Sequence, residues 1–219
     1  MTLTDKEFPA REIPSLQVRE LTREEVRRIW HERMREDFPR NELKPLRMIE
    51  GALDRGEYLP LGASLPTDGA DSEAGDRIAA YAFFVTPGDA ALFDYLAVRR
   101  DLRDKGYGSA FLRSLAPTLA RFRTVLLESD DPDFAPDEGE RAHRLSRLAF
   151  YEKNGLMDTG VRASVFGAAF RILVFPGQTG MPDREDTAKL YKELYRTFLP
   201  NPVLERMVRI TSTDNKETP

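Results

Sequence analysis

Residues 103–109, with the sequence RDKGYGS, have the residue types of an anion-binding turn. They follow an apolar segment typical of a strand, residues 91–98, and precede one typical of a helix. Backbone N–H groups at a glycine-containing turn, aligned by a helix N-terminus, bind phosphate oxygens. The segment therefore predicts a site for a phosphate-bearing ligand, and an ordinary strand-to-helix turn is the alternative.

Two other phosphate-binding patterns do not fit this segment. A dinucleotide-binding fingerprint would need a third glycine where Phe111 stands, and the chain has no Gly-Lys-Ser/Thr tripeptide of a Walker A loop. The sequence therefore predicts neither of these two classes of phosphate-binding protein.

The elements around the turn predict one α/β (α+β) domain with a mixed sheet. Strands are expected at 16–21, 58–63, 78–85, 91–98 and 125–128, with one long bent strand or two over 163–175. Helices are expected at 22–37, 45–55, 106–122, 140–154 and 186–199. Pro117 should kink or shorten the third of these helices. Strands joined by turns early in the chain, followed by strand–helix alternation, are typical of such a domain.

Two segments together resemble the signature motifs of the GNAT acyltransferase superfamily. The first joins LFDYLAV over residues 92–98 to RDKGYG over residues 103–108, and it is similar to that family's central strand and acetyl-CoA loop. The second, FYEKNGL over residues 150–156, is similar to a helix that ends in Tyr-x-x-x-Gly before an apolar residue. The two occur in the family's order and spacing. The resemblance covers residues 78–156, and Arg144 departs from it at a position where many members carry Asn.

The resemblance implies a mostly antiparallel sheet flanked by helices, splayed between its two central strands, with an additional C-terminal helix. It implies acetyl-CoA as the acyl donor, with the pantetheine arm in the splay and the pyrophosphate over the loop. The residues expected to bind acetyl-CoA are Leu96, Ala97 and Val98 on the strand and Arg103, Asp104, Lys105, Gly106, Tyr107, Gly108 and Ser109 in the loop.

Tyr151 matches the tyrosine that lies near the acetyl-CoA sulfur in this family. A phenol has an ordinary pKa of about 10, so its hydroxyl could protonate a departing thiolate. A tyrosine that only packs against the sheet is the alternative.

Two carboxylates are candidates for the base that deprotonates an acceptor amine. Asp94 alternates with Leu92 and Leu96, so we expect these three side chains to share one face of the strand. A carboxylate in an apolar strand is unfavourable unless it is paired or used. Glu128 stands at the end of the next strand, at the expected mouth of the splay. Each carboxylate could instead be a structural partner of an arginine, and a reaction without a dedicated base stays open.

The composition excludes several other chemistries. The chain has no Cys and only two histidines, His31 and His143, so we expect no disulfide, no cysteine nucleophile and no metal site. The missing cysteine also favours direct attack of the amine in a ternary complex over an acyl-enzyme. A formal net charge of −4 among 219 residues does not favour nucleic-acid binding.

Residues 128–140 contain seven carboxylates and no basic residue. Such a segment could attract a cationic amine by raising its local concentration. A solvated polar loop is the simpler interpretation.

We expect a loose leader over 1–15, the acyltransferase domain over 16–176, a C-terminal helical arm over 177–210 and a disordered tail over 211–219. The apolar stripe of the arm predicts core packing or a homodimer contact, with a substrate lid as the alternative; it comprises Leu190, Leu194, Tyr195 and Phe198. The charged first residues do not have a signal-peptide pattern, and the longest apolar run, residues 78–85, is too short to span a membrane. A cytoplasmic protein without membrane contact is expected.

The expected function is acetyl-CoA-dependent N-acetylation of a primary amine, with a small-molecule amine as the favoured acceptor. A catalytically silent acyl-CoA-binding domain and an interaction module without affinity for CoA are the alternatives.

Overall fold

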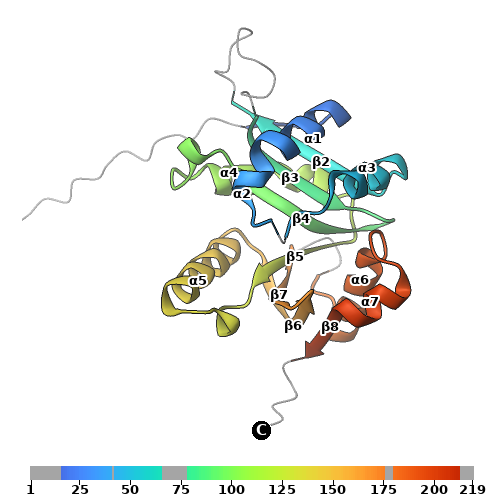
Figure 1. The fold of residues 1–219 in the computed structure, drawn as a ribbon. Coiled ribbons are helices and arrows are strands. Elements are labelled where there is room, and N and C mark those ends of the chain that lie inside the picture. Colours follow the sequence, from blue (N-terminus) through green and yellow to red (C-terminus); the bar gives the residue numbers. More distant parts are fainter. Residues whose placement is uncertain (1–15, 41, 66–77, 176–179, 213–219) are drawn as a thin grey trace, which may run out of the picture.

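One mixed sheet of eight strands forms the centre of the protein. The computed structural model describes residues 16–40, 42–65, 78–175 and 180–212 (Figure 1). The strand order is β1-β2-β3-β4-β5-β7-β6-β8, and every neighbouring pair is antiparallel except β4 and β5. The strands are β1 (Gln17–Glu20), β2 (Tyr58–Ser64), β3 (Ile78–Val85), β4 (Ala90–Val98), β5 (Thr124–Asp130), β6 (Met157–Val165), β7 (Ala168–Phe175) and β8 (Val208–Ser212).

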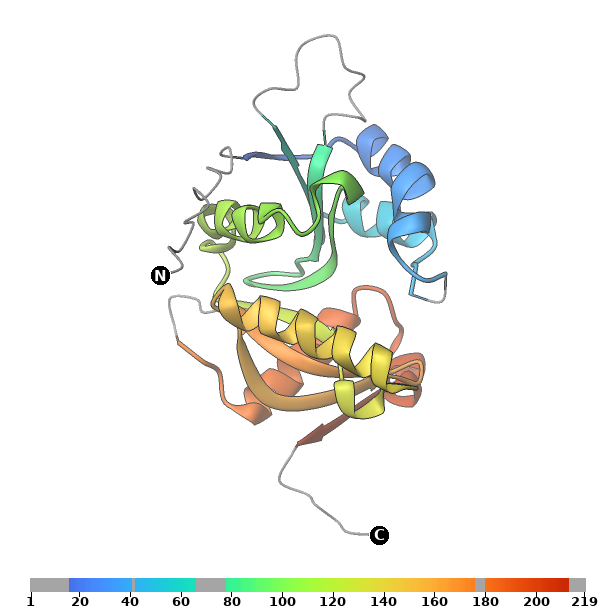
Figure 2. The ribbon, with the colours of Figure 1, turned by 90° about the vertical axis from the view of Figure 1, so that its left-hand side faces the viewer.

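Helices cover both faces of this sheet (Figures 1 and 2). Helices α4 and α5 pack on one face, which we call the donor face, and the apolar side chains of α1, α3, α6 and α7 pack on the other, the acceptor face. The helices are α1 (Arg23–Ile29), the π-helical turn η1 (Trp30–Met34), α2 (Arg35–Asp37), α3 (Leu46–Asp54), α4 (Tyr107–Leu119), α5 (Glu138–Lys153), α6 (Arg184–Tyr195) and α7 (Asn201–Met207), with the 3-10 turns η2 (Arg100–Leu102) and η3 (Pro132–Phe134).

The expected helices and strands are present. Most of their ends differ by a few residues, but β6 begins at Met157, six residues before the expected start at residue 163. Helix α1 begins with the capping box that its sequence predicts, since Thr22 and Glu25 each accept the other's backbone N–H. Helix α4 ends at Leu119, two residues after Pro117 and three before the expected end. Most of the polar loop expected over 64–75 lies outside the described residues.

The C-terminal arm contains more than the expected helix. After α6 the chain forms α7 and then β8, which pairs antiparallel with β6 from Val208 opposite Val165 to Ser212 opposite Val161. Residues 211–212, expected in a disordered tail, are therefore part of the sheet, and the arm is not purely helical. Pairing over a large sequence separation decides this strand, and local pattern does not reveal it.

The two parallel strands β4 and β5 separate part-way along their length. Their ladder has four pairs, from Ala90 opposite Thr124 to Phe93 opposite Leu127, and then ends. Strand β4 stays paired with β3 up to Val98, and β5 stays paired with β7 up to Asp130. The sheet is thus splayed in its centre, as the family resemblance implied, and the gap is visible in Figure 2.

A β-bulge in β4 lies at the start of the splay. Phe93 is opposite Phe84 and Tyr95 is opposite Phe83, so Asp94 is the extra residue. The bulge shifts the alternation by one position. Leu92 and Tyr95 therefore pack on the acceptor face, whereas Leu96 packs on the donor face. The expectation that Leu92, Asp94 and Leu96 share one face is wrong for Leu96.

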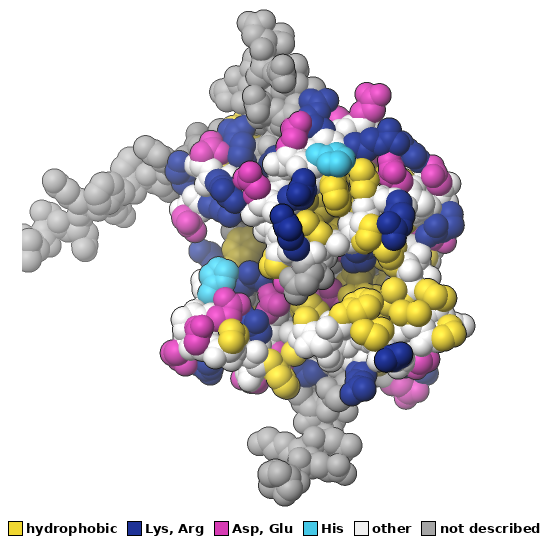
Figure 3. Space-filling view, in the orientation of Figure 1, with side chains coloured by type: hydrophobic (Ala, Val, Ile, Leu, Met, Phe, Trp, Pro, Cys, Tyr) yellow, Lys and Arg dark blue, Asp and Glu magenta, His cyan; other side chains and the backbone are white. Residues whose placement is uncertain are grey.

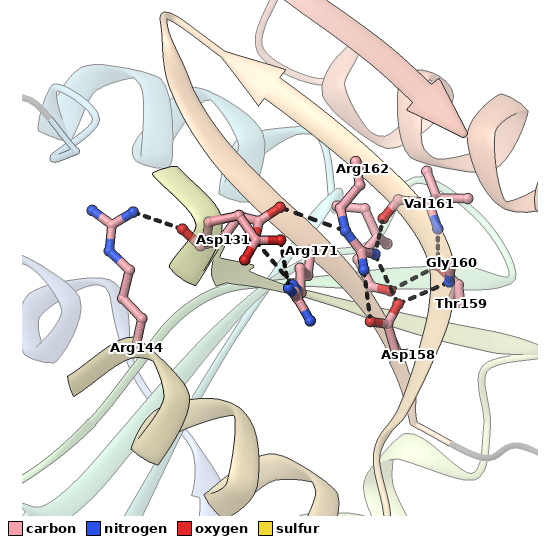
Figure 4. Close-up of polar contacts among 10 residues, drawn as sticks. Asp131, Arg144, Asp158, Thr159, Gly160, Val161, Arg162 and Arg171 are labelled. Carbon is pink, nitrogen blue, oxygen red and sulfur yellow. Dashed lines mark hydrogen bonds and ion pairs between the residues drawn. The ribbon is translucent and has the colours of Figure 1, made fainter. Parts of the chain in front are cut away.

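A buried aspartate joins the end of β5 to the neighbouring strands (Figure 4). Asp131 is 2% exposed, and its carboxylate accepts from Arg171 Nε at 3.0 Å and lies 3.5 Å from Arg162 Nε. Its backbone carbonyl accepts from Arg144 Nη1 at 2.9 Å. The carboxylate and carbonyl of one residue therefore hold β6, β7 and α5 together.

Replacing Asp131 by Asn should lower the free energy of unfolding by about 2 kcal/mol, because hydrogen bonds to charged groups contribute about 1.5–3 kcal/mol. Asp133 also pairs with Arg171, at 3.0 Å, but its side chain is 63% exposed. Asp133→Asn is therefore the matched control, with an expected loss of at most about 0.5 kcal/mol. Equal losses for the two variants in urea denaturation would contradict a special role for Asp131.

Candidate active site

The turn between β4 and α4 leaves the first amide groups of a helix available. Asp104 and Gly106 have left-handed backbone conformations, with φ of 58° and 85°. Gly106 is the N-cap of α4 and no side chain accepts a hydrogen bond from the first turn. The N–H groups of Tyr107, Gly108 and Ser109 therefore point out of a thirteen-residue helix without a side-chain cap, which is the arrangement that binds phosphate oxygens.

The two cations of the turn hold the turn itself in place. Arg103 Nε donates to Val98 O at 2.9 Å, and its Nη2 donates to Asp37 Oδ1 at 2.6 Å. Lys105 Nζ donates to Asp101 O at 2.6 Å. Arg103 thus connects the loop to the end of β4 and to α2. The positive charge stays beside the helix N-terminus, but part of each cation's hydrogen-bonding capacity is used within the protein.

Packing against a neighbouring helix favours glycine at position 108, which the sequence did not reveal. A Cβ at this position would lie 3.1 Å from Cζ of Phe150, a residue of α5. The glycine therefore allows α4 and α5 to approach each other closely, whether or not a ligand is bound. Gly106 is different, because its positive φ is the conformation in which glycine is favoured.

Asp94 is buried on the acceptor face with two partners. Its side chain is 4% exposed, and Oδ1 accepts from Nζ of Lys44, which lies just before α3. Its Oδ2 accepts from the hydroxyl of Tyr58 on β2 at 2.5 Å. Burial, followed by the Asp94 charge, raises the pKa of Tyr58 well above its usual value, so the phenol stays a donor. The bulge residue is therefore a carboxylate that is paired with a cation.

Glu128, from the neighbouring strand β5, lies on the same face. Its Oε1 accepts from the Tyr191 hydroxyl and, at 2.6 Å, from the Tyr195 hydroxyl, both on α6. Burial raises the pKa of Glu128, and the two hydroxyls and the Lys44 charge oppose this increase. Glu128 has no ion pair among the described contacts, in contrast to Asp94.

The structure brings Asp94 and Glu128 together but places Tyr151 on the other face. Tyr151 is 8% exposed and packs among the apolar side chains of the donor face. Its hydroxyl makes no hydrogen bond within the described part of the chain. Burial raises the pKa of Tyr151 to about 12. Its phenol is therefore protonated at neutral pH.

Three residues of the acceptor face were absent from the sequence interpretation, namely Lys44, Tyr58 and Tyr191. The only available signal was the pair Tyr191 and Tyr195, which are one helical turn apart and thus share a face. The stripe expected on the arm is core, since Leu194 and Tyr195 are buried, but the Tyr195 hydroxyl also reaches Glu128.

Most carboxylates of the acidic segment over 128–140 are paired with arginines of the protein. Four of its carboxylates pair with arginines of α5 or β7, and Asp137 caps α5 by accepting from Glu140 N. A fifth, Asp133, pairs with Arg171. This segment is a structural element rather than a free negative surface.

The splay opens to the surface. Figure 3 shows a hollow between the half of the molecule that carries α1–α4 and the half that carries α5–α7, with acidic and hydrophobic side chains at its border. The candidate site therefore has an uncapped helix N-terminus at the end of β4 and two carboxylates at the point where β4 and β5 diverge.

Comparison with known proteins identifies this arrangement at the level of the fold. No protein-family model and no curated protein matches the sequence. Among solved structures, a Bacteroides thetaiotaomicron protein assigned to the acetyltransferases of the GNAT family aligns with a TM-score of 0.59 and 20% identity, over 82% of this chain and 96% of its own. The chain has the GNAT fold.

Two further GNAT-fold structures align over most of their own length. The ribosomal-protein-S18-alanine N-acetyltransferase of Escherichia coli has a TM-score of 0.51 and 20% identity, over 77% of this chain and 97% of its own. A chimaera that includes the spermidine N-acetyltransferase of Vibrio cholerae has a TM-score of 0.51 and 10% identity, over 74% of this chain and 95% of its own. The fold that the two sequence motifs implied is thereby confirmed.

The described residues contain neither a metal-binding cluster nor a membrane-spanning helix. No group of three or more His, Asp and Glu side chains is placed there to hold a metal ion. No helix in the same ranges is long and apolar enough to cross a membrane.

Proposed function

We propose that this GNAT-fold chain is an N-acetyltransferase that transfers an acetyl group from acetyl-CoA to a primary amine. The observation that supports this most is the divergence of β4 and β5 after Phe93, flanked by an uncapped helix N-terminus and a pair of carboxylates. The helix N-terminus suits an anionic donor and the carboxylate pair suits a cationic acceptor. The splay between β4 and β5 connects the two.

The donor side fits acetyl-CoA in two respects. The β4 edge that faces β5 has no ladder partner from β5 after Phe93. Backbone groups of Leu96, Ala97 and Val98 along that edge would pair with the amides of a pantetheine chain. The N–H groups of Tyr107, Gly108 and Ser109 would bind the pyrophosphate, within the positive potential of Arg103 and Lys105. Asp104 and Gly106 provide the left-handed turn that exposes those amides. The bound donor supplies an acyl group activated as a thioester.

Glu128 is the better base of the two carboxylates. Asp94 is held by the Lys44 ammonium and the Tyr58 hydroxyl, so both of its carboxylate oxygens already have partners. Glu128 receives only hydroxyl hydrogen bonds, and burial raises its pKa. A carboxylate with a raised pKa accepts a proton more readily near neutral pH. Glu128 therefore takes the proton of the acceptor ammonium, and Asp94 holds charge in the site.

Tyr151 is the proposed acid on the donor face. Its hydroxyl is protonated at neutral pH and is not used by another protein group, so it is free to donate to a departing thiolate. The direct route, with amine and donor bound together, follows because no cysteine is present to form an acyl-enzyme.

A small cationic amine is the favoured acceptor. Asp94 and Glu128 together carry two potential negative charges, and Lys44 balances one of them. A buried pair of carboxylates favours a cationic ligand over a neutral or anionic one. The names of two fold relatives, which act on spermidine and on the alanine of a ribosomal protein, are compatible with an amine acceptor.

Binding of acetyl-CoA at the α4 N-terminus is tested with Ser109. Ser109→Asp places a negative charge in the first turn, which does not disturb the helix because acidic residues are favourable there. It should weaken acetyl-CoA binding about tenfold or more in calorimetric titration, through repulsion of the pyrophosphate. Ser109→Asn introduces a side chain of the same size as aspartate but without charge. Its Kd for acetyl-CoA should be within about threefold of that of the wild type. A folded wild-type protein that does not bind acetyl-CoA would sink the proposal.

The role of Tyr151 separates an enzyme from a silent acyl-CoA-binding domain. Tyr151→Phe should lower kcat by about 10²–10⁴-fold, because a positioned acid contributes that much, while the Kd for acetyl-CoA stays unchanged. Stopped assays with a panel of primary amines give kcat, and calorimetry gives Kd. If the wild type binds acetyl-CoA but acetylates no amine, the silent-domain alternative holds.

The identity of the base is read from the acid limb of the kcat/KM profile. A base must be ionised, so activity falls as pH decreases through its pKa. Tyr195→Phe removes a hydrogen bond that lowers the pKa of Glu128, so the acid limb should move to higher pH. Tyr58→Phe is the matched control, since that hydroxyl serves Asp94. A limb that moves with Tyr58→Phe and not with Tyr195→Phe would assign the base to Asp94.

A further inference from the structure

The Lys44 ammonium occupies a cage of one carboxylate and two aromatic rings. Nζ donates to Asp94 Oδ1 and lies 5.4 Å from the ring centroid of Tyr95 and 5.1 Å from that of Phe198. Both distances are within the range of cation–π attraction. A buried anion with two aromatic faces is the chemistry by which proteins recognise an alkylammonium ion.

This cage lies at the start of the splay. Asp94 is the bulge residue, and the β4–β5 ladder ends one residue before it. Glu128 lies across the splay, and the Lys44 charge lowers the pKa of its carboxyl group. The cation therefore lies on the acceptor face, in contact with Asp94 and near enough to Glu128 to influence its pKa.

The Lys44 backbone is fixed, but its side chain has an exit. Lys44 N donates to Tyr95 Oη at 2.8 Å, and Lys44 O accepts from Trp30 Nε1 at 3.1 Å. The side chain is 21% exposed, so part of it is in contact with solvent. Rotation about its side-chain torsions can withdraw the ammonium without moving the backbone, and the withdrawn cation would be hydrated.

We propose that this cage, formed by Asp94, Tyr95 and Phe198, is the binding site of the acceptor's ammonium group, and that Lys44 is a tethered competitor which the acceptor displaces. This proposal rests on the proposed function, because only an acetyltransferase would have an acceptor. The cage and its occupation by Lys44 do not depend on that function. Because the site fits the end of a lysine side chain, the ligand class is an unbranched aliphatic primary ammonium.

A tethered competitor has a high effective concentration, typically in the millimolar range for short flexible linkages. It therefore weakens the apparent affinity for a free amine without contributing to the chemistry. An acceptor with contacts beyond the ammonium gains an advantage over simple amines, because only such contacts compensate for displacing Lys44. The lysine thus acts as a specificity element against small, weakly bound amines.

The displacement is observed directly by NMR of the wild-type chain with ¹³C-labelled lysine, titrated with n-butylammonium chloride without donor. The ring currents of Tyr95 and Phe198 should shift the Lys44 ε-CH₂ signal upfield, and Lys44→Arg assigns it. Saturable movement of this signal to the position of a solvated lysine, with Lys192 unchanged, is the expected result. Binding of the amine with an unmoved Lys44 signal, or no binding, would overturn the proposal.

Kinetics with acetyl-CoA and n-butylamine give a second readout. Lys44→Met keeps the apolar stem and removes the charge, and should lower the KM for the amine about tenfold while kcat changes less than about threefold. Lys192→Met, which removes an ion pair with Glu205 on the arm, is the matched control and should leave both constants unchanged. A lower kcat with an unchanged KM for Lys44→Met would make Lys44 a positioning residue for Asp94 and contradict competition.

The two experiments separate the inference from the proposed function. Displacement of Lys44 in a chain that does not bind acetyl-CoA would support the ammonium site and reject the acetyltransferase. Amine acetylation with Lys44 fixed in its cage would support the acetyltransferase and reject the competitor.

Discussion

The loss of pairing between β4 and β5 after Phe93 is the constraint on which the site depends. Backbone groups that leave a ladder need other partners, and a strand edge left inside a sheet is a site for an extended ligand. The bulge at Asp94 occurs where the pairing ends, and it directs a carboxylate and Tyr95 to the same face. In the proposed reaction, donor and acceptor would meet at this point because the sheet opens there.

Buried charge explains why the C-terminal arm belongs to the site. Asp94 and Glu128 cannot remain in a mostly apolar region without partners. Lys44 and Tyr58 satisfy the first, while Tyr191 and Tyr195 of α6 satisfy the second. The arm is held in turn by β8, which extends the sheet beyond β6. The C-terminal arm therefore packs as part of the core and also supplies the hydrogen-bond donors to Glu128.

The partners of a buried carboxylate also distinguish structural carboxylates from those available for a ligand. The carboxylates after β5 are matched by arginines, with Asp131 at the centre of the network in Figure 4, so they stabilise the junction of β5, β7 and α5. Glu128, a few residues earlier, has hydroxyl partners and no arginine. Composition alone shows an acidic stretch, and only the partners show that one of its members differs from the rest.

The sequence by itself determined the order of most elements, the position of the glycine turn and the two carboxylate candidates, and its resemblance to the GNAT motifs indicated the fold. These depend on local signals: hydrophobic period, caps, and glycine and proline positions. The tertiary structure decided the phase of β4 after its bulge, the packing role of Gly108 and the strand β8. It alone brought Lys44, Tyr58 and Tyr191 to the carboxylates. The physical reason is that those features depend on contacts between segments far apart in the chain, where a one-residue shift of register changes the face to which a side chain points.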